Sequence, residues 1–204
     1  FNLEDYKGAI VDFTKAIQIN PNNSYYYFYR AYSKSELKDY KGSIADYTRA
    51  IELDPKDNAA YNNRGISKSE LKDYKGAISD YTRSIELDPK HKYAYKNRGD
   101  SKYNLEDYYG AISDYTRAIE LYPNKAGAYV NRGWAKYNLK DNTGAISDYT
   151  RAIELDPNDG MAYNNRGAAK NKLKDYKGAI ADYTRAIELD PKDDAAYNNR
   201  GSSK

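Results

Sequence analysis

The side chains that usually carry enzyme chemistry are scarce in this sequence. Its 204 residues include no cysteine and one histidine, His91, so thiolate chemistry, disulfides and cysteine-based or multi-histidine metal sites are excluded. Asp and Glu recur at regular intervals suited to helix caps and ion pairs, and no glycine-rich phosphate loop accompanies them. We therefore predict no catalytic residue, no metal ligand and no cofactor, and we place His91 in an exposed turn.

Amide and aromatic side chains, by contrast, are frequent and evenly spaced. The chain has 25 tyrosines, which supply buried rings where aliphatic residues are few. Asparagine recurs every 34 residues at Asn63, Asn97, Asn131, Asn165 and Asn199. Because a carboxamide offers both a donor and an acceptor, such a row can match the N–H and C=O groups of an extended peptide. The alternative is a solvated polar residue copied by repeat duplication.

The spacing of these residues comes from an internal repeat, which accounts for the whole chain since 204 is six times 34. We predict a single array over residues 1–204. The partial units are 1–23, with only a second helix, and 194–204, with only a first helix. The full units are 24–57, 58–91, 92–125, 126–159 and 160–193.

Each full unit reads as two helices. In the second half of unit 58–91, apolar and aromatic residues recur at the spacing of one helix face; they are Tyr74, Ala77, Ile78, Tyr81 and Ile85. Asp73 stands at the N-cap position, and Pro89 ends the helix because the residue before proline avoids the α region. A single unit cannot bury its apolar faces, so we predict an all-α solenoid of stacked helix pairs.

The unit resembles the tetratricopeptide repeat. It has an aromatic residue in the fourth position, glycine in the eighth, a small residue and an aromatic residue in the second helix, and a closing proline. In unit 58–91 these residues are Tyr61, Gly65, Ala77, Tyr81 and Pro89. The resemblance covers the whole chain and implies antiparallel helix pairs that wind into a right-handed superhelix, with a concave groove lined by the first helices. It also implies a protein-interaction role.

Two positions depart from the family pattern, which usually has Leu in the seventh position and Tyr in the eleventh. Here the seventh holds arginine and the eleventh holds lysine in every unit, as at Arg64 and Lys68. Because an unpaired charge near the packing face is costly, each arginine needs a partner. We predict ion pairs between Arg30, Arg64, Arg98, Arg132 and Arg166 and, respectively, Asp46, Asp80, Asp114, Asp148 and Asp182.

Two groups of residues on the first helices are candidates for ligand binding, together with the asparagine row. Trp134 is the only tryptophan, and we expect Tyr103, Val130, Tyr137 and Met161 to surround it in an exposed apolar cluster. Local core packing is the alternative. In the first full unit, one aromatic stripe faces the expected groove. Its members are Tyr25, Phe28, Tyr29 and Tyr32. Packing on the helix predicted at 1–19, or on a neighbouring molecule, is the alternative.

The partner that we predict is a protein or peptide of unknown identity. Some family members bind acidic chaperone tails through a set of lysine and asparagine side chains. This sequence lacks that set, since Asp100 and Met161 stand at two of its positions. Lysines are interleaved with Asp and Glu at a net charge of +3, which disfavours nucleic acid as a partner. No apolar run is long enough to span a membrane. We expect a soluble protein, with the cytoplasm slightly favoured.

The two partial units add a further expectation. Segments 1–23 and 194–204 together make one full unit of 34 residues, so the face at one end complements the face at the other. The alternative to a peptide-binding scaffold is therefore a structural module that self-associates head to tail. A longer natural array that covers both faces would explain the same pattern.

Overall fold

The computed structural model describes residues 3–203, and all regular elements in that range are α-helices. This confirms the predicted all-α repeat solenoid. The helices form two compact units, residues 1–105 and 106–204. The single array over 1–204 and its right-handed superhelix stay predictions.

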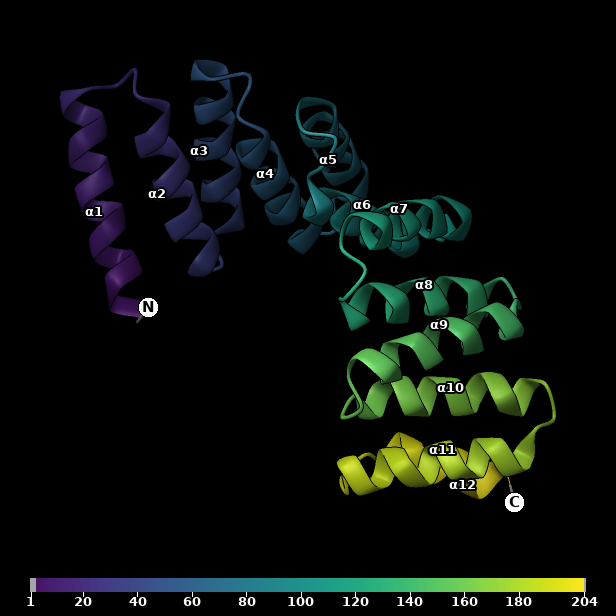
Figure 1. The fold of residues 1–204 in the computed structure, drawn as a ribbon. Helices are drawn as coiled ribbons and strands as arrows, with labels where there is room; N and C mark the ends of the chain where they lie inside the picture. Colours follow the sequence, from purple (N-terminus) through teal and green to yellow (C-terminus); the bar gives the residue numbers. More distant parts are fainter. Residues whose placement is uncertain (1–2, 204) are drawn as a thin grey trace. The chain divides into compact units, whose positions relative to one another are not determined.

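Each unit contains six helices of the described chain, and consecutive helices run in alternating directions (Figure 1). The first unit comprises α1 (Leu3–Ile19), α2 (Ser24–Glu36), α3 (Tyr40–Leu53), α4 (Asn58–Glu70), α5 (Tyr74–Leu87) and α6 (Lys92–Asn104). The second comprises α7 (Tyr108–Leu121), α8 (Ala126–Asn138), α9 (Asn142–Leu155), α10 (Gly160–Lys172), α11 (Tyr176–Leu189) and α12 (Asp194–Ser202).

The helix boundaries follow from capping. Asp73 accepts a hydrogen bond from the backbone N–H of Gly76 at 3.0 Å, so the predicted N-cap is confirmed. Asp88 closes α5 with an extended backbone, φ −137° and ψ 93°, as expected of a residue that precedes proline. An aspartate N-cap recurs at most of the described helices, and α2 to α11 have 13 or 14 residues each, whereas α1 has 17 and α12 has 9.

The tight turn inside each helix pair contains a non-glycine residue with positive φ. These residues are Lys38, Lys72, Glu106, Lys140 and Lys174, with φ between 62° and 64°. A β-carbon is unfavourable in this left-handed region. The strain is tolerated because the N-cap and the packed helices hold the turn from both sides.

The core depends on a close contact between tyrosine and glycine. Tyr81 is 1% exposed, and a Cβ added to Gly65 would lie 2.7 Å from its Cε1 atom. The equivalent contacts join Gly133 to Tyr149 and Gly167 to Tyr183. In these three repeats the first helix approaches the second this closely because glycine has no side chain, whereas repeat 24–57 has the buried Ala31 at this position. The tyrosine and glycine positions of the sequence pattern are therefore one packing contact.

Candidate functional site

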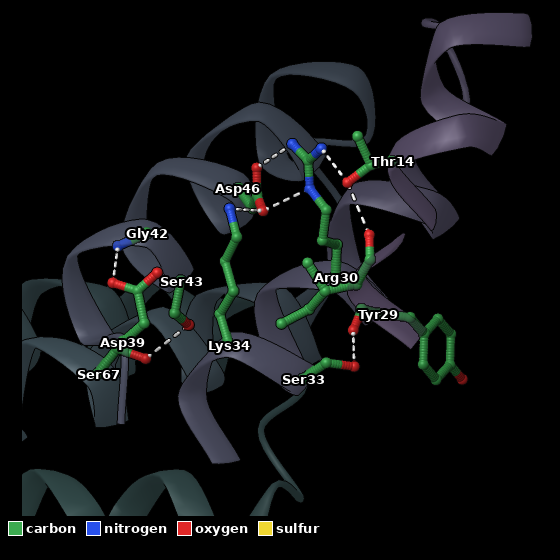
Figure 2. Close-up of polar contacts among 11 residues, drawn as sticks. Thr14, Tyr29, Arg30, Ser33, Lys34, Asp39, Gly42, Ser43, Asp46 and Ser67 are labelled. Atoms are coloured by element: carbon green, nitrogen blue, oxygen red, sulfur yellow. Dashed lines mark hydrogen bonds and ion pairs between the residues drawn. The ribbon is translucent and has the colours of Figure 1, made fainter. Parts of the chain in front are cut away.

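In four of the described repeats, an ion-pair network around a buried aspartate holds the first helix to the second helix. Arg30 on α2 donates from Nε and Nη2 to the two carboxylate oxygens of Asp46 on α3, at 2.8 and 2.6 Å (Figure 2). Lys34, one turn after Arg30, lies 2.7 Å from the same carboxylate. The third arginine nitrogen, Nη1, donates to the hydroxyl of Thr14 on α1 at 3.2 Å. We call this set of four side chains the clamp.

The clamp recurs with nearly unchanged geometry within both units. Its other copies are Arg64, Lys68, Asp80 and Thr48; Arg132, Lys136, Asp148 and Thr116; and Arg166, Lys170, Asp182 and Thr150. The predicted Arg–Asp pairs are therefore confirmed in these copies. Arg98 and Asp114 belong to different units, so that pair stays a prediction.

Hydrogen bonding keeps the clamp charges paired although they are removed from water. Asp46 is 5% exposed, and its two oxygens are shared between Arg30 and Lys34. Hydrogen bonds to Asp46 are the main cause of a raised pKa at Arg30, whose guanidinium also lies 5.7 Å from the ring centroid of Tyr27. With its partners satisfied, the clamp holds the first helix at a fixed spacing from the helices on either side.

The asparagine row lies between neighbouring first helices. Asn97 on α6 donates from Nδ2 to Oδ1 of Asn62 on α4 at 3.2 Å, and Asn62 donates to Asn63 at 3.1 Å. In the second unit, Asn199 on α12 donates to Asn164 on α10 in the same way, at 3.1 Å. Asn62 and Asn164 were not predicted as site residues. Their position, one residue before the row, was the signal available in the sequence.

Two further members of the row differ in their partners. Asn63 lies close enough to the buried hydroxyl of Tyr47 to offset part of the rise in its pKa that burial causes. Asn165 keeps Nδ2 buried without a partner among the described residues, and Asn131 has an interacting partner. The row is thus part of a lateral network. Each lateral bond uses one N–H of a carboxamide, so the second N–H and the remaining lone pairs stay available for other groups.

The candidate tryptophan cluster divides between core and surface. Val130 on α8 is 5% exposed, so the expectation that it lies in an exposed cluster is wrong. It belongs to the buried core of the second unit, and the half-buried Trp134 and Tyr137 pack against that core. Met161 on α10 is 56% exposed, whereas Tyr103 lies on α6 of the other unit.

The aromatic stripe on α2 packs largely on α1, as its alternative interpretation expected. Tyr29 stacks on Phe13 with centroids 5.9 Å apart, Tyr25 meets Phe13 edge-on at 6.4 Å, and Tyr32 meets Tyr6 edge-on at 6.2 Å. Phe28 instead packs edge-on against Tyr47 on α3. Three rings, those of Tyr25, Tyr29 and Tyr32, remain exposed by 54%, 39% and 41%, and the Tyr29 ring points away from the clamp in Figure 2.

Neither a cluster of metal ligands nor a membrane-spanning helix is present in the described residues. Between residues 3 and 203, no group of three or more His, Asp or Glu side chains could hold a metal ion. None of the described helices combines the length and apolar character needed to cross a membrane. His91 caps α6 by accepting from the N–H of Ala94 at 3.1 Å and is half-buried, so the expected exposed position is wrong. Because it caps α6, the imidazole lies against the first turn of that helix.

Antiparallel helix pairs of constant length, repeated at a fixed interval and joined by one recurring clamp, define a helical-repeat protein. The family model of the tetratricopeptide repeat matches residues 1–23, 24–57, 59–91, 96–160 and 161–193. The chain therefore belongs to the tetratricopeptide repeat family, as the sequence pattern predicted. No curated protein matches it.

Solved structures share the fold. YrrB, described as a tetratricopeptide repeat protein with an unusual peptide-binding site, is 24% identical, with 93% of this chain and 97% of that chain covered and a TM-score of 0.80. MamA from Desulfovibrio magneticus RS-1 is 20% identical over 84% of this chain and 97% of that chain, with a TM-score of 0.79. The first repeat domain of Spaghetti (RPAP3), bound to an HSP90 peptide, is 30% identical over 55% of this chain and 89% of that chain, with a TM-score of 0.54.

Proposed function

We propose that this chain is a non-enzymatic scaffold that binds an extended peptide or a partner helix along the face of its first helices. The observation that carries the proposal is the asparagine row, which places carboxamides side by side along that face with hydrogen-bonding capacity left over. The descriptions of YrrB and of the Spaghetti domain as peptide-binding proteins support the same function.

Each unit offers its own combination of backbone and side-chain contacts. In the second unit, Asn131 and Asn199 would pair with peptide N–H and C=O groups, and Asn165 would accept through Oδ1 because its Nδ2 is buried. Trp134 and Met161 would contact an apolar side chain. In the first unit, Asn63 and Asn97 would have the same role beside the exposed rings of Tyr25, Tyr29 and Tyr32. Rigid aromatic rings are frequent affinity anchors at such surfaces.

The test uses Trp134 as a built-in probe, because it is the only tryptophan in the chain. Peptides selected from a random library are titrated while tryptophan fluorescence is followed. Asn165→Ala should weaken a selected peptide by about tenfold, the effect of losing hydrogen bonds worth about 1.4 kcal/mol. Asn124→Ala, in an exposed turn of the same unit, is the matched control. Equal affinities for both variants would contradict the role of the row.

Self-association is the second candidate, and the open face of α12 favours it. Arg200 donates to Thr184 and lies 5.5 Å from the Tyr197 ring centroid, but it has no carboxylate partner within residues 3–203. A Cβ added to Gly201 would meet nothing within 4 Å. On α1, the exposed Asp12 is followed by Phe13, the order in which the clamp aspartate and the packed tyrosine occur elsewhere.

Charge exchange tests this candidate through the molar mass measured by light scattering. Arg200→Asp and Asp12→Arg should each keep the chain monomeric, because each places like charges in the contact. An equimolar mixture should associate, since its two kinds of chain have complementary charges. A mixture that stays monomeric, or a wild-type mass independent of concentration, would contradict self-association.

A further inference from the structure

A hollow lies at the edge of the second unit where α8 ends and α9 begins. Its volume is about 390 Å³, and it is lined by Tyr137, Asn138, Lys140, Asn142 and Lys172. Asn142 stands where the other repeats have tyrosine, at Tyr6, Tyr40, Tyr74, Tyr108 and Tyr176. The turn itself is unchanged, because Asp141 still caps α9 by accepting from the N–H of Gly144 at 2.9 Å. The hollow is therefore the space of a missing ring in an otherwise regular repeat.

The tyrosine at this position has a defined surrounding in the first unit. The ring of Tyr6 meets that of Tyr32 edge-on, and its hydroxyl lies 3.4 Å from the carboxylate of Glu36. Tyr40 has Glu70 nearby in the equivalent place: its pKa is raised first by desolvation and next by the negative charge of Glu70. In both cases the residue thirty positions later is an acid that lies near the phenol.

At the hollow, the residue equivalent to Glu36 and Glu70 is a lysine and has the opposite charge. Thirty positions after Asn142 comes Lys172, and Lys140 lies on the rim. No ion pair is formed by either lysine with a described residue, and both are exposed. The nearest acid in sequence, Asp141, is engaged as the cap of α9. An aromatic ring of a ligand bound in this hollow would lie beside the ammonium groups of Lys172 and Lys140, whereas the ring of Tyr6 lies beside the carboxylate of Glu36.

We propose that the hollow binds an aromatic ring with a strong anion in the para position, which is the chemistry of phosphorylated or sulfated tyrosine. The ring replaces the missing tyrosine beside Tyr137, and the anion pairs with Lys172 and Lys140. An unmodified tyrosine leaves the lysines without an anion, and phosphoserine leaves the ring space empty. The site goes beyond the proposed groove function, with which it shares only Tyr137.

The proposal is tested by NMR titration of the whole chain with N-acetyl-O-phosphotyrosine amide. We expect saturable amide shifts confined to residues 137–144 and 168–173. N-acetyltyrosine amide and phosphoserine should each need concentrations higher by about tenfold or more for the same shifts, since each lacks one of the two contacts. O-sulfotyrosine is the second arm: equal binding shows that any para anion is accepted, and weaker binding shows selection for phosphate, both within the proposed class.

Two variants and a matched control separate this site from general attraction to lysines. Asn142→Tyr restores the ring of the other repeats and should abolish the local shifts while the fold is kept. Lys172→Glu restores the acid seen at Glu36 and should weaken binding by about tenfold or more. Lys174→Glu makes the same charge change outside the hollow and should have little effect. Shifts spread over many lysines, no shifts, or an equal loss in Lys174→Glu would overturn the proposal. Groove-peptide binding would stay unaffected by Asn142→Tyr.

Discussion

The clamp predicts that a single buried carboxylate supports much of the stability of its repeat. In the copy on α4 and α5, Asp80 is 3% exposed and receives Arg64 through two hydrogen bonds of 2.9 and 2.7 Å and Lys68 through a third contact at 2.7 Å. Asp80→Asn keeps the shape of the side chain but removes its charge. Two cations then face each other near the core without an anion between them.

The expected cost follows from the burial of the two cations. Removing one partner of a buried ion pair costs about 3–5 kcal/mol. The side chains of Arg64 and Lys68 keep 15% and 21% of their surface exposed, so water relieves part of the penalty. We therefore expect a loss near the lower end of that range, about 3 kcal/mol of unfolding free energy.

The assay is urea unfolding followed by far-ultraviolet circular dichroism, with Glu86→Gln as the matched control. Glu86 lies on the same helix and pairs with Arg83 at 2.9 Å, but both side chains are about half exposed, so losing this pair should have little effect. Because repeat arrays can unfold in parts, the dependence on urea must be alike in the variants for the energies to be compared.

A second variant keeps the test decisive if Asp80→Asn does not fold. Replacing the buried Arg–Asp pair with apolar residues, in Arg64→Met combined with Asp80→Leu, should recover part of the lost stability, because Lys68, which is 21% exposed, is then the one cation left without its carboxylate. The reasoning is refuted if Asp80→Asn costs no more than Glu86→Gln. It is also refuted if the double variant is less stable than Asp80→Asn.

Three further predictions concern the groove, the irregular turn and alkaline pH. Trp134→Ala should weaken groove peptides by about 2 kcal/mol and destabilise the chain less than Tyr149→Ala, measured by fluorescence-polarisation binding and thermal melting. Hydrogen exchange should be faster in residues 140–144 than in 106–110, because Asn142 removes a ring from that turn. Burial raises the pKa of Tyr81 above its usual value of 10.0, so above about pH 10 the unfolded chain releases a proton that the folded chain keeps. The free energy of unfolding should therefore fall as the pH rises past this value, and Tyr81→Phe should reduce that fall.

Each of these predictions has a clear contrary result. Unaltered peptide affinity with a large loss of melting temperature in Trp134→Ala would make that residue part of the core only. Equal exchange rates in the two turns would show that the cap alone sets their stability. A pH dependence that is the same in Tyr81→Phe and the unchanged chain would mean that this buried phenol does not contribute.

Local patterns in the sequence predicted the fold well because each repeat contains its own structural signals. Asp73 and Pro89 mark the beginning and end of a helix by local chemistry, and the charge of Arg64 near a packing face requires an acid such as Asp80. The second cation of the clamp, Lys68, departs from the family pattern, but no partner was predicted for it. Lys68 pairs with Asp80, which also binds Arg64, because this carboxylate is buried within reach of both cations.

The candidate site was predicted less completely, because it depends on contacts between helices. The hydrogen bond from Asn97 to Asn62 depends on the distance between α4 and α6. The spacing of residues along the sequence does not give this distance. Burial of Val130 likewise follows from how the helices of the second unit pack. The division into units at residue 105 has no counterpart in the sequence, where the 34-residue period continues without interruption.

The clamp joins residues that are close together in the sequence, and this affects how the chain folds. Arg64 binds an aspartate 16 positions ahead and a threonine 16 positions behind, so closing either loop costs little entropy. Contacts of such low sequence separation favour rapid folding. Because nearly the same clamp recurs within both units, a folding nucleus can form at any of several repeats and spread to its neighbours. A substitution in one clamp would then redirect folding to another repeat instead of stopping it, and folding rates would change less than unfolding rates.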